Sequence, residues 1–358
     1  MHIPDGYLSP ASCTALYAGS APFWYVALRR MKRAMNTQMI PLVSVFSAFS
    51  FIVMMFNLPL PGGTTGHATG LGIATIVLGP WAAMLAISVA LIIQAVFFGD
   101  GGITTIGANC FNMAILGSLA VYVIYRMISG RATLTSPRRV VAGALAGYIS
   151  INLSALITAV ELGIQPLYYH DSTGAPLYAP YPLHITIPAM LIGHLTVVGV
   201  AEMVITGGVV AYLQRAEPSL LRLTAPGARV DRPDGKPAGT HGTHGTRRLW
   251  VALAILMILT PLGIIAAGKA WGEWSPDDFS NQQTRGQIAA ASGNQPLPAE
   301  APTGLRHFGS VWTAPMPGYA PRFLKSAGFG YMLSAAAGTG VIILVILLAG
   351  WIFERRAA

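Results

Sequence analysis

The first two residues of the chain, Met1 and His2, carry three nitrogen atoms that could bind one transition metal ion together. The α-amino group of Met1, the deprotonated amide of His2 and the His2 imidazole would close two fused chelate rings. These nitrogens would occupy three corners of a square plane, a geometry that suits Ni²⁺ or Cu²⁺. The alternative interpretation is a frayed terminus that binds nothing.

A fourth nitrogen is needed to complete such a plane, and His67 is the histidine best placed to supply it. His67 lies in the glycine-rich segment PGGTTGHATG, between two apolar stretches. Non-helical backbone at membrane depth is tolerated only where protein buries it or where it lines a cavity. We therefore expect a metal site made by Met1, His2 and His67. For a single loop histidine, a role without any ligand is the competing interpretation.

A second polar segment could hold the imidazoles in place. The stretch FFGDGGITTIGANCFNM, residues 97–113, carries Asp100, Thr104, Asn109 and Asn112 among glycines. Side chains of this kind commonly accept or donate the hydrogen bonds that orient metal-bound histidines. Asp5 precedes Gly6 in a turn signal that would fold the first residues back, and it could also bond a histidine. The alternative is that the segment is only a connecting turn.

Other candidate groups are weaker. Glu161 and Glu202 lie in or near apolar stretches, where carboxylates are functional suspects. For Glu161, solvation at the outer end of a helix is a sufficient explanation. Glu202 is expected to face neighbouring helices or a partner subunit rather than a proton path. The stretch 263–270 imitates a phosphate-binding loop, but Ala270 stands where Ser or Thr is required, so no nucleotide is expected there.

These residues must be positioned by membrane-spanning helices. Hydrophobic residues make up 53% of the chain and charged residues only 10%, whereas soluble domains carry about a quarter charged residues. The N-terminal MHIPDGYLSP has no basic region followed by an apolar core, so we expect no signal peptide and a mature chain that keeps Met1 and His2. The predicted fold class is therefore an all-α, polytopic membrane protein.

Nine apolar stretches are long enough, or nearly so, to cross a bilayer. The stretch 69–98 is too long for one span, and Gly79-Pro80 should divide it into two passes, the first of them short. The expected helices are near 11–29, 39–57, 69–79, 81–98, 108–128, 139–163, 185–213, 248–268 and 331–353.

The basic residues set the orientation, because Lys and Arg collect on the cytoplasmic side. With nine crossings and the N-terminus outside, five of the 22 Lys and Arg residues fall outside and the others inside. We therefore expect an extracytoplasmic N-terminus and a cytoplasmic C-terminus. Three parts follow: a seven-helix metal-binding module (1–215), a cytoplasmic linker (216–247) and a two-helix accessory module (248–358) with an extracytoplasmic loop (269–330).

The motifs MHIPDGYLSP, GGTTGHATG and GDGGITTIGANCFNM, in this order, resemble the substrate-specific membrane component of energy-coupling-factor cobalt and nickel transporters, the CbiM/NikM family. The resemblance covers about residues 1–215. It implies a near-square-planar metal site made by the Met1 amine, the His2 amide and imidazole, and His67. Residues 248–358 look like the small two-helix accessory component of these systems, fused to the main module.

The resemblance also implies partners, namely a transmembrane coupling protein and ATPase subunits in the cytoplasmic membrane of a prokaryote. No cofactor is expected, and Ni²⁺ or Co²⁺ would be the transported ligand. Partner contacts are expected at closely packed small residues, either Ala11 and Ala15 or Gly143 and Gly147. The main alternative is a secondary metal carrier driven by an ion gradient. A membrane enzyme is disfavoured because the apolar stretches contain no acid, base or nucleophile cluster such as paired carboxylates or HExxH. The choice between nickel and cobalt stays open.

Overall fold

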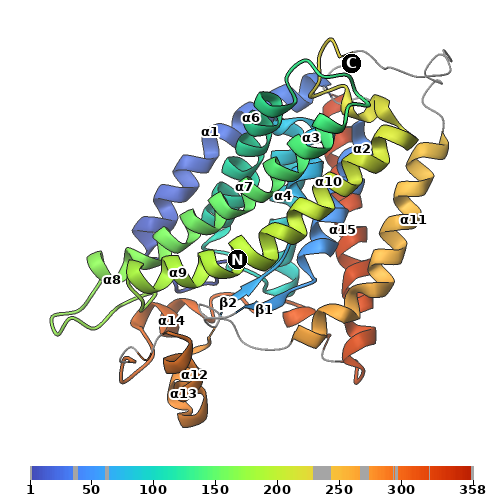
Figure 1. Ribbon diagram of the computed structural model, residues 1–358. Helices are drawn as coiled ribbons and strands as arrows, with labels where there is room; N and C mark the ends of the chain where they lie inside the picture. Colours follow the sequence, from blue (N-terminus) through green and yellow to red (C-terminus); the bar gives the residue numbers. More distant parts are fainter. Residues whose placement is uncertain are drawn as a thin grey trace.

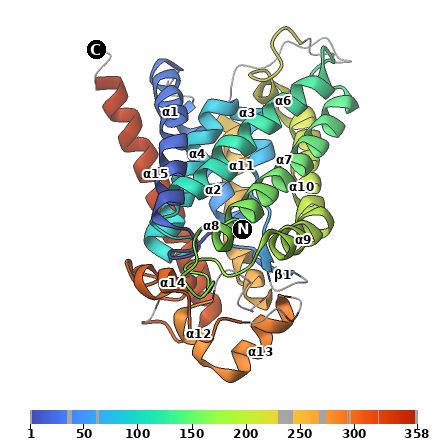
Figure 2. The same cartoon turned by 90° about the vertical axis from the view of Figure 1, so that its left-hand side faces the viewer.

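The chain folds into a helical bundle with a small layer of short elements at one end (Figures 1 and 2). The computed structural model describes residues 2–34, 39–60, 64–228, 243–266, 274–292, 294, 297–321 and 323–355. The first half of the chain contains α1 (Pro10–Ala34), α2 (Met39–Met54), β1 (Leu58–Leu60), β2 (Thr64–Gly66), α3 (Leu71–Leu78), α4 (Pro80–Ile93), η1 (Gln94–Phe98), α5 (Ile106–Asn109), η2 (Cys110–Gly117), α6 (Ser118–Ser129) and α7 (Pro137–Gly163).

The second half continues the bundle, forms the layer of short elements at its end and returns to the bundle with its last helix. It contains α8 (Gln165–Tyr168), α9 (Leu183–Gly193), η3 (His194–Val198), α10 (Gly199–Ala216), η4 (Pro218–Leu221), α11 (Thr243–Leu259), η5 (Thr260–Ala266), α12 (Pro276–Ser280), α13 (Gln282–Ala291), α14 (Thr303–Phe308), η6 (Pro317–Tyr319) and α15 (Ala327–Arg355). The segments η1, η2 and η3 are π-helical, and each is continuous with a neighbouring α-helix. Segment η1 is the end of the helix that begins with α4, whereas η2 joins α5 to α6 and η3 joins α9 to α10.

Among the described residues, five helical segments are long and apolar enough to cross a membrane: Pro80–Phe98, Ile106–Ser129, Pro137–Tyr168, Leu183–Ala216 and Ala327–Ile352. Two shorter apolar helices, Met39–Met54 and Leu249–Ile264, join them. The chain is therefore a multi-pass membrane protein. Each of the nine apolar stretches named above coincides with a helix, and Gly79 separates α3 from α4.

The third of those stretches forms a helix that is three residues shorter than the stretch itself. Residues 69–79 were expected to form a short pass, but α3 has only eight residues, which corresponds to about 12 Å of a hydrocarbon layer of about 30 Å. All of its residues, Leu71–Leu78, are buried by neighbouring helices. The connection 57–70, which contains β1, β2 and His67, leads into α3. An all-α fold was expected, and this antiparallel pair of strands, with Leu58 opposite Gly66, is the exception.

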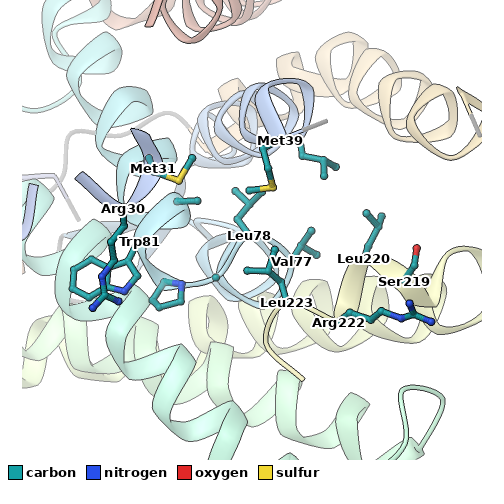
Figure 3. A pocket seen from close by; sticks show the side chains of 14 residues that line it. Arg30, Met31, Met39, Val77, Leu78, Trp81, Ser219, Leu220, Arg222 and Leu223 are labelled. Carbon is teal, nitrogen blue, oxygen red and sulfur yellow. The ribbon is translucent and has the colours of Figure 1, made fainter. Parts of the chain in front are cut away.

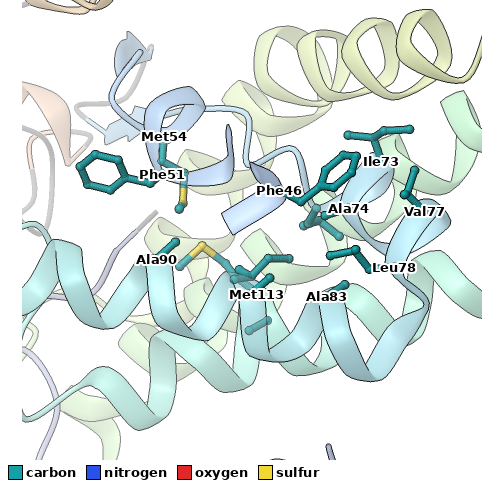
Figure 4. Packing of buried hydrophobic residues seen from close by; sticks show 14 of the residues in the cluster. Phe46, Phe51, Met54, Ile73, Ala74, Val77, Leu78, Ala83, Ala90 and Met113 are labelled. Carbon is teal, nitrogen blue, oxygen red and sulfur yellow. The ribbon is translucent and has the colours of Figure 1, made fainter. Parts of the chain in front are cut away.

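The hydrophobic core joins the two parts of the chain. Phe51 and Met54 of α2, Ile73 of α3 and Met113 of η2 belong to one continuous buried cluster (Figure 4). Helix α15 packs against α2 so closely that a Cβ atom at Gly338 would lie 2.2 Å from the Phe51 ring. Helix α15 thus belongs to the same bundle as the helices of the first half of the chain.

The short helices α12, α13 and α14 lie at the end of the bundle where β1, β2 and α8 are found (Figure 1). They cover the N-terminal segment, because Tyr7 and Leu8 pack in one buried cluster with Trp274, Phe279 and Leu305. The Tyr7 hydroxyl donates a hydrogen bond of 3.0 Å to the Trp274 carbonyl. The C-terminal loop therefore closes over the first residues of the chain.

Candidate metal-binding site

The N-terminal segment is firmly held inside the protein from His2 onward. The Ile3 amide donates to Asn109 Oδ1 at 2.8 Å, and Asn109 Nδ2 donates back to the Ile3 carbonyl at 3.1 Å. The Gly102 amide also donates to that carbonyl, at 2.9 Å. His2 is only 8% exposed, which is not the behaviour of a frayed terminus.

Asp5 holds the same segment to the loop that follows η1. Its Oδ1 accepts hydrogen bonds from the amide of Thr104, at 2.7 Å, and from the Thr104 hydroxyl. Its Oδ2 accepts from the Ile103 amide at 3.1 Å. This close approach requires a glycine at 102, because a Cβ atom there would lie 2.3 Å from the Asp5 nitrogen. Asp5 thus bonds the loop backbone instead of a histidine.

The structure brings His2 and His67 together although they are far apart in the sequence. Their imidazole rings stack with centroids 4.8 Å apart and planes inclined by 24°. His67 is 2% exposed. In the described part of the chain, Nε2 of His2 and Nε2 of His67 are both buried without a hydrogen-bond partner. Buried polar atoms are normally satisfied, so two such nitrogens side by side mark a place for a ligand.

The protonation of His67 suits a metal ligand. The side chain of His67 is almost fully buried, and burial penalises the charged form of an imidazole. Its Nδ1 lies 3.2 Å from the Ala68 carbonyl. If Nδ1 carries the proton and donates it to that carbonyl, the lone pair is on Nε2. The nitrogen without a protein partner is then the one able to bind a cation.

Asp100 pairs with the His2 ring. Its Oδ1 lies 2.7 Å from His2 Nδ1. Burial alone would raise the pKa of the Asp100 carboxyl, but the charge and hydrogen bond of His2 hold this pKa below its usual range. Asp100 is therefore a carboxylate. Its negative charge beside the imidazole would favour a bound cation.

The second oxygen of Asp100 is held by residues that the sequence interpretation did not include. The Tyr319 hydroxyl donates to Asp100 Oδ2 at 2.5 Å, and Gln94 Nε2 donates to it at 3.3 Å. Tyr319 belongs to the C-terminal part of the chain, and its ring stacks on Phe98 with centroids 4.8 Å apart. A single Gln in the apolar run LIIQAVFF could have been noticed, whereas nothing in the sequence near Tyr319 indicates its contact.

Two expectations about polar residues need correction. Asn112 was expected beside the imidazoles, but it faces α7, where its Nδ2 donates to Glu161 Oε2 at 2.7 Å and to Thr158 Oγ1 at 3.1 Å. Glu161 was expected to be solvated, but it is only 8% exposed. The reason is that the N-terminal segment covers this end of α7, with the Ser9 amide donating to Gln165 at 3.0 Å.

The chelate expected at the N-terminus is only partly visible. Met1, whose amine would be one ligand, lies outside the described residues. For an imidazole to share a metal with the amide of its own residue, Nδ1 is the nitrogen near enough to close the ring. Here His2 Nδ1 is paired with Asp100, so a chelate of this kind would require the His2 ring to exchange this partner.

One cavity among the described residues is roomy but does not suit a metal ion. It has a volume of about 570 Å³ and lies between α1, α2, the end of α3 and η4, with Arg30, Trp81 and Arg222 in its wall (Figure 3). The Arg30 guanidinium lies 4.4 Å from the Trp81 ring centroid. Cationic side chains repel a metal cation. Arg30 and Leu78, near the ends of α1 and α3, also place the cavity away from the histidines.

Comparison with known proteins defines the class. Residues 2–220 match the family described as the cobalt uptake substrate-specific transmembrane region, CbiM. Residues 246–355 match the PDGLE domain. The chain thus belongs to the CbiM family of metal uptake membrane components and carries a fused PDGLE domain.

Two relatives are similar to this chain over nearly its whole length, and one solved structure over part of it. The fused nickel transport protein NikMN of Rhodobacter capsulatus is 50% identical over 359 residues, which covers 100% of both chains. The probable fused nickel transport protein LarMN of Lactiplantibacillus plantarum is 41% identical and covers 98% of this chain and 97% of its own. A crystal structure of a transition metal transporter is 49% identical, with a TM-score of 0.57 over 60% of this chain and 93% of that one.

Proposed function

We propose that this chain is the substrate-capture subunit of an energy-coupling-factor uptake transporter for Ni²⁺ or Co²⁺. The observation that carries the proposal is the pair of stacked, buried imidazoles of His2 and His67, each with an Nε2 atom that has no partner in the described part of the protein. Membership of a cobalt uptake family and similarity to nickel transport proteins support it.

In the proposed complex, four nitrogens surround the metal in a plane. They are the Met1 amine, the His2 amide, His2 Nδ1 and an imidazole nitrogen of His67. When His2 turns Nδ1 toward the metal, its Nε2–H becomes free to donate to Asp100, the usual role of a carboxylate behind a ligating histidine. All-nitrogen ligation accepts both metals, and the names of the two fused relatives favour nickel.

The proposed topology has nine passes, with the N-terminus outside and the C-terminus in the cytoplasm. The third pass consists of α3 and the end of the connection before it. Residues 66–70 of that connection are buried, so non-helical backbone is permitted there, because protein and not lipid surrounds it. Residues 1–215 form the metal-binding module and 248–358 the accessory module, joined by the linker 216–247. The site then faces the side from which metal arrives.

Energy is proposed to come from partner subunits, a transmembrane coupling protein and ATPases. Of the two small-residue pairs considered for this contact, Gly143 and Gly147 pack internally, because a Cβ atom at either would lie within 3.1 Å of an α10 side chain. Ala11 and Ala15 of α1 are exposed and are the better candidates. A secondary carrier is the alternative, and gradient-driven metal uptake by the purified chain alone in vesicles would favour it.

The experiment that tests the site adds one Gly before Met1. The extension moves the amine out of the chelate while His2 and His67 remain. Nickel binding by the purified protein, confirmed uncleaved by mass spectrometry, should lose most of its affinity, whereas a tag after Ala358 should cost little. Wild-type affinity in the extended protein would exclude the amine-anchored site. Metal content after growth with equal Ni²⁺ and Co²⁺ identifies the preferred ion.

A further inference from the structure

Glu202 of α10 is a fully buried carboxylate that points at the connection following His67. Its Oε2 accepts hydrogen bonds from the Thr69 amide at 2.7 Å and from the Gly70 amide at 3.0 Å. Its Oε1 accepts from the Gly72 amide at 3.1 Å. We call this arrangement of Glu202 with Thr69, Gly70 and Gly72 the Glu202 clamp.

The Glu202 clamp supplies the hydrogen-bond acceptor that the residue before α3 cannot provide. The first amides of a helix have no partner within the helix, and a side chain just before it usually accepts from them. The residue before α3 is Gly70, which has no side chain and adopts a left-handed φ of 66°. A carboxylate from another helix takes this role, and its negative charge is favourable at the positive end of the α3 dipole.

Close packing around the clamp leaves little freedom to the backbone. A Cβ atom at Gly72 would lie 2.2 Å from the Thr206 hydroxyl, one turn after Glu202. A Cβ atom at Gly147 of α7 would lie 2.8 Å from the same hydroxyl. Glycines at these positions let α3, α7 and α10 approach one another, so Glu202 can reach the backbone of residues 69–72.

His67 is separated from the clamp by a single residue, Ala68. On the N-terminal side of His67, strand β2 ends at Gly66, the residue directly before it. The His67 backbone is therefore held between a strand pair and the clamp, while its Nδ1 lies within hydrogen-bond distance of the Ala68 carbonyl. A shift of residues 69–72 would move the imidazole relative to His2.

We infer that Glu202 is a positioning residue for metal capture, which holds His67 in place from α10 without touching the metal. This inference rests on the proposed function. It also makes α10 the helix through which a change at His67 can reach the rest of the bundle. The same carboxylate could instead serve only to stabilise the fold, and the two roles predict different results.

Glu202→Gln tests the inference, because glutamine keeps the size but, whichever way its amide is turned, presents an NH₂ group where at least one backbone amide needs an acceptor. We expect a 10- to 100-fold loss of nickel affinity, the range typical of changes behind metal ligands. His67 should also become reactive toward diethyl pyrocarbonate, measured on its peptide by mass spectrometry, because it is 2% exposed in the intact protein.

Gln214→Met is the matched control on the same helix. Gln214 Nε2 donates to the carbonyls of Leu134 and Ser136, each at 2.8 Å, at the other end of α10. This variant removes comparable hydrogen bonds between an α10 side chain and the backbone of a segment between helices. It should leave the nickel affinity and the protection of His67 from the reagent unchanged. Equal affinity loss in both variants would assign Glu202 a general stabilising role and overturn the inference.

Thr69→Ala decides the matter if Glu202→Gln does not fold. The Thr69 hydroxyl lies 3.4 Å from Glu202 Oε2, and it accepts from the Leu71 amide at 3.3 Å. Its loss loosens the clamp mildly, so a two- to fivefold weaker affinity and partial exposure of His67 are expected. Wild-type affinity with a protected His67, in whichever variant folds, would overturn the inference while leaving the proposed function intact. Failure of the wild-type protein to bind nickel would instead remove the proposed function.

Discussion

The two histidines of the candidate site are held in different ways. His2 lies in a segment without regular secondary structure, and its neighbour Ile3 is held by hydrogen bonds with Gly102 of the loop after η1 and with Asn109 of α5. The backbone following His67 is clamped by the Glu202 carboxylate, deep between helices. The His2 side therefore depends on contacts between two irregular segments, whereas the His67 side belongs to the packed bundle.

The two histidines also differ in which part of the chain supports them. Asp100, the partner of His2, accepts a hydrogen bond from Tyr319 of the C-terminal part. Glu202 and the residues 69–72 that it holds all belong to the first part. This suggests a division of roles, in which His67 is a fixed ligand and His2 is the ligand that moves when the metal enters. Substitutions on each side test it.

His67→Ala should have the largest effect. One of four nitrogens is lost and the plane stays open, so nickel affinity should fall by more than the about 100-fold typical of changes behind the ligands. The loop substitution removes no membrane-spanning surface, so membrane yield should be normal. Metal stoichiometry of the purified protein is the measurement, with His170→Ala, at an exposed histidine, as control. Full stoichiometry in His67→Ala would exclude His67 as a ligand.

His2→Ala should come next and match the N-terminal extension in severity, about 100-fold. The imidazole that closes the second chelate ring is lost, although the amine and the amide remain. Isothermal titration with Ni²⁺ measures the affinity, and the unfolding temperature should stay near that of the wild-type protein, because Asn109 still bonds the Ile3 backbone. An effect below about fivefold would argue against a chelate that includes the His2 ring.

Much of this arrangement could be predicted from local sequence. Apolar length located the helices, and Gly79-Pro80 gave the break between α3 and α4, because proline lacks the amide that a continuous helix requires. The proposed pairing of His2 with His67 came from chelate chemistry and from a family resemblance. The structure places those two rings in contact.

Other features could not be predicted because they depend on distant contacts or on altered helix geometry. Asn109 and Asn112 would lie near one face of an α-helix, but the π-helical segment η2 begins at Cys110 and turns Asn112 toward α7. The burial of Glu161 requires the N-terminal segment to pack over α7. The contact between Asp100 and Tyr319 joins residues 219 positions apart, which no local pattern can indicate.

Asp100→Asn should have an intermediate effect of about 10-fold on nickel affinity. The amide can still accept one hydrogen bond from His2, but the negative charge beside the cation is lost. Affinity should be measured at several salt concentrations, since the charge contribution shrinks with screening. Affinity equal to or tighter than that of the wild-type protein would mean that Asp100 only holds the vacant His2 ring and competes with the metal for Nδ1.

Tyr319→Phe should have the smallest effect, about threefold, because it acts on the metal only through Asp100 and His2. Phenylalanine keeps the ring stacked on Phe98 and removes only the hydroxyl that donates to Asp100 Oδ2. Gln94 still bonds the same oxygen at 3.3 Å, which limits the loss. Tyr331→Phe is the matched control, because its ring lies 5.3 Å from that of Tyr319 in the same aromatic group.

The decisive comparison repeats Tyr319→Phe in the Asp100→Asn background. If Tyr319 acts through the carboxylate, the two changes are coupled, and the hydroxyl has no further effect once Asp100 is gone. Independent losses that simply add would place the influence of Tyr319 elsewhere, for example in its stacking between the two parts of the chain. The same variant also tests whether the two histidines are held separately. Tyr319→Phe should leave the reactivity of His67 toward diethyl pyrocarbonate unchanged. An increase in that reactivity would mean that the two histidines are not held separately.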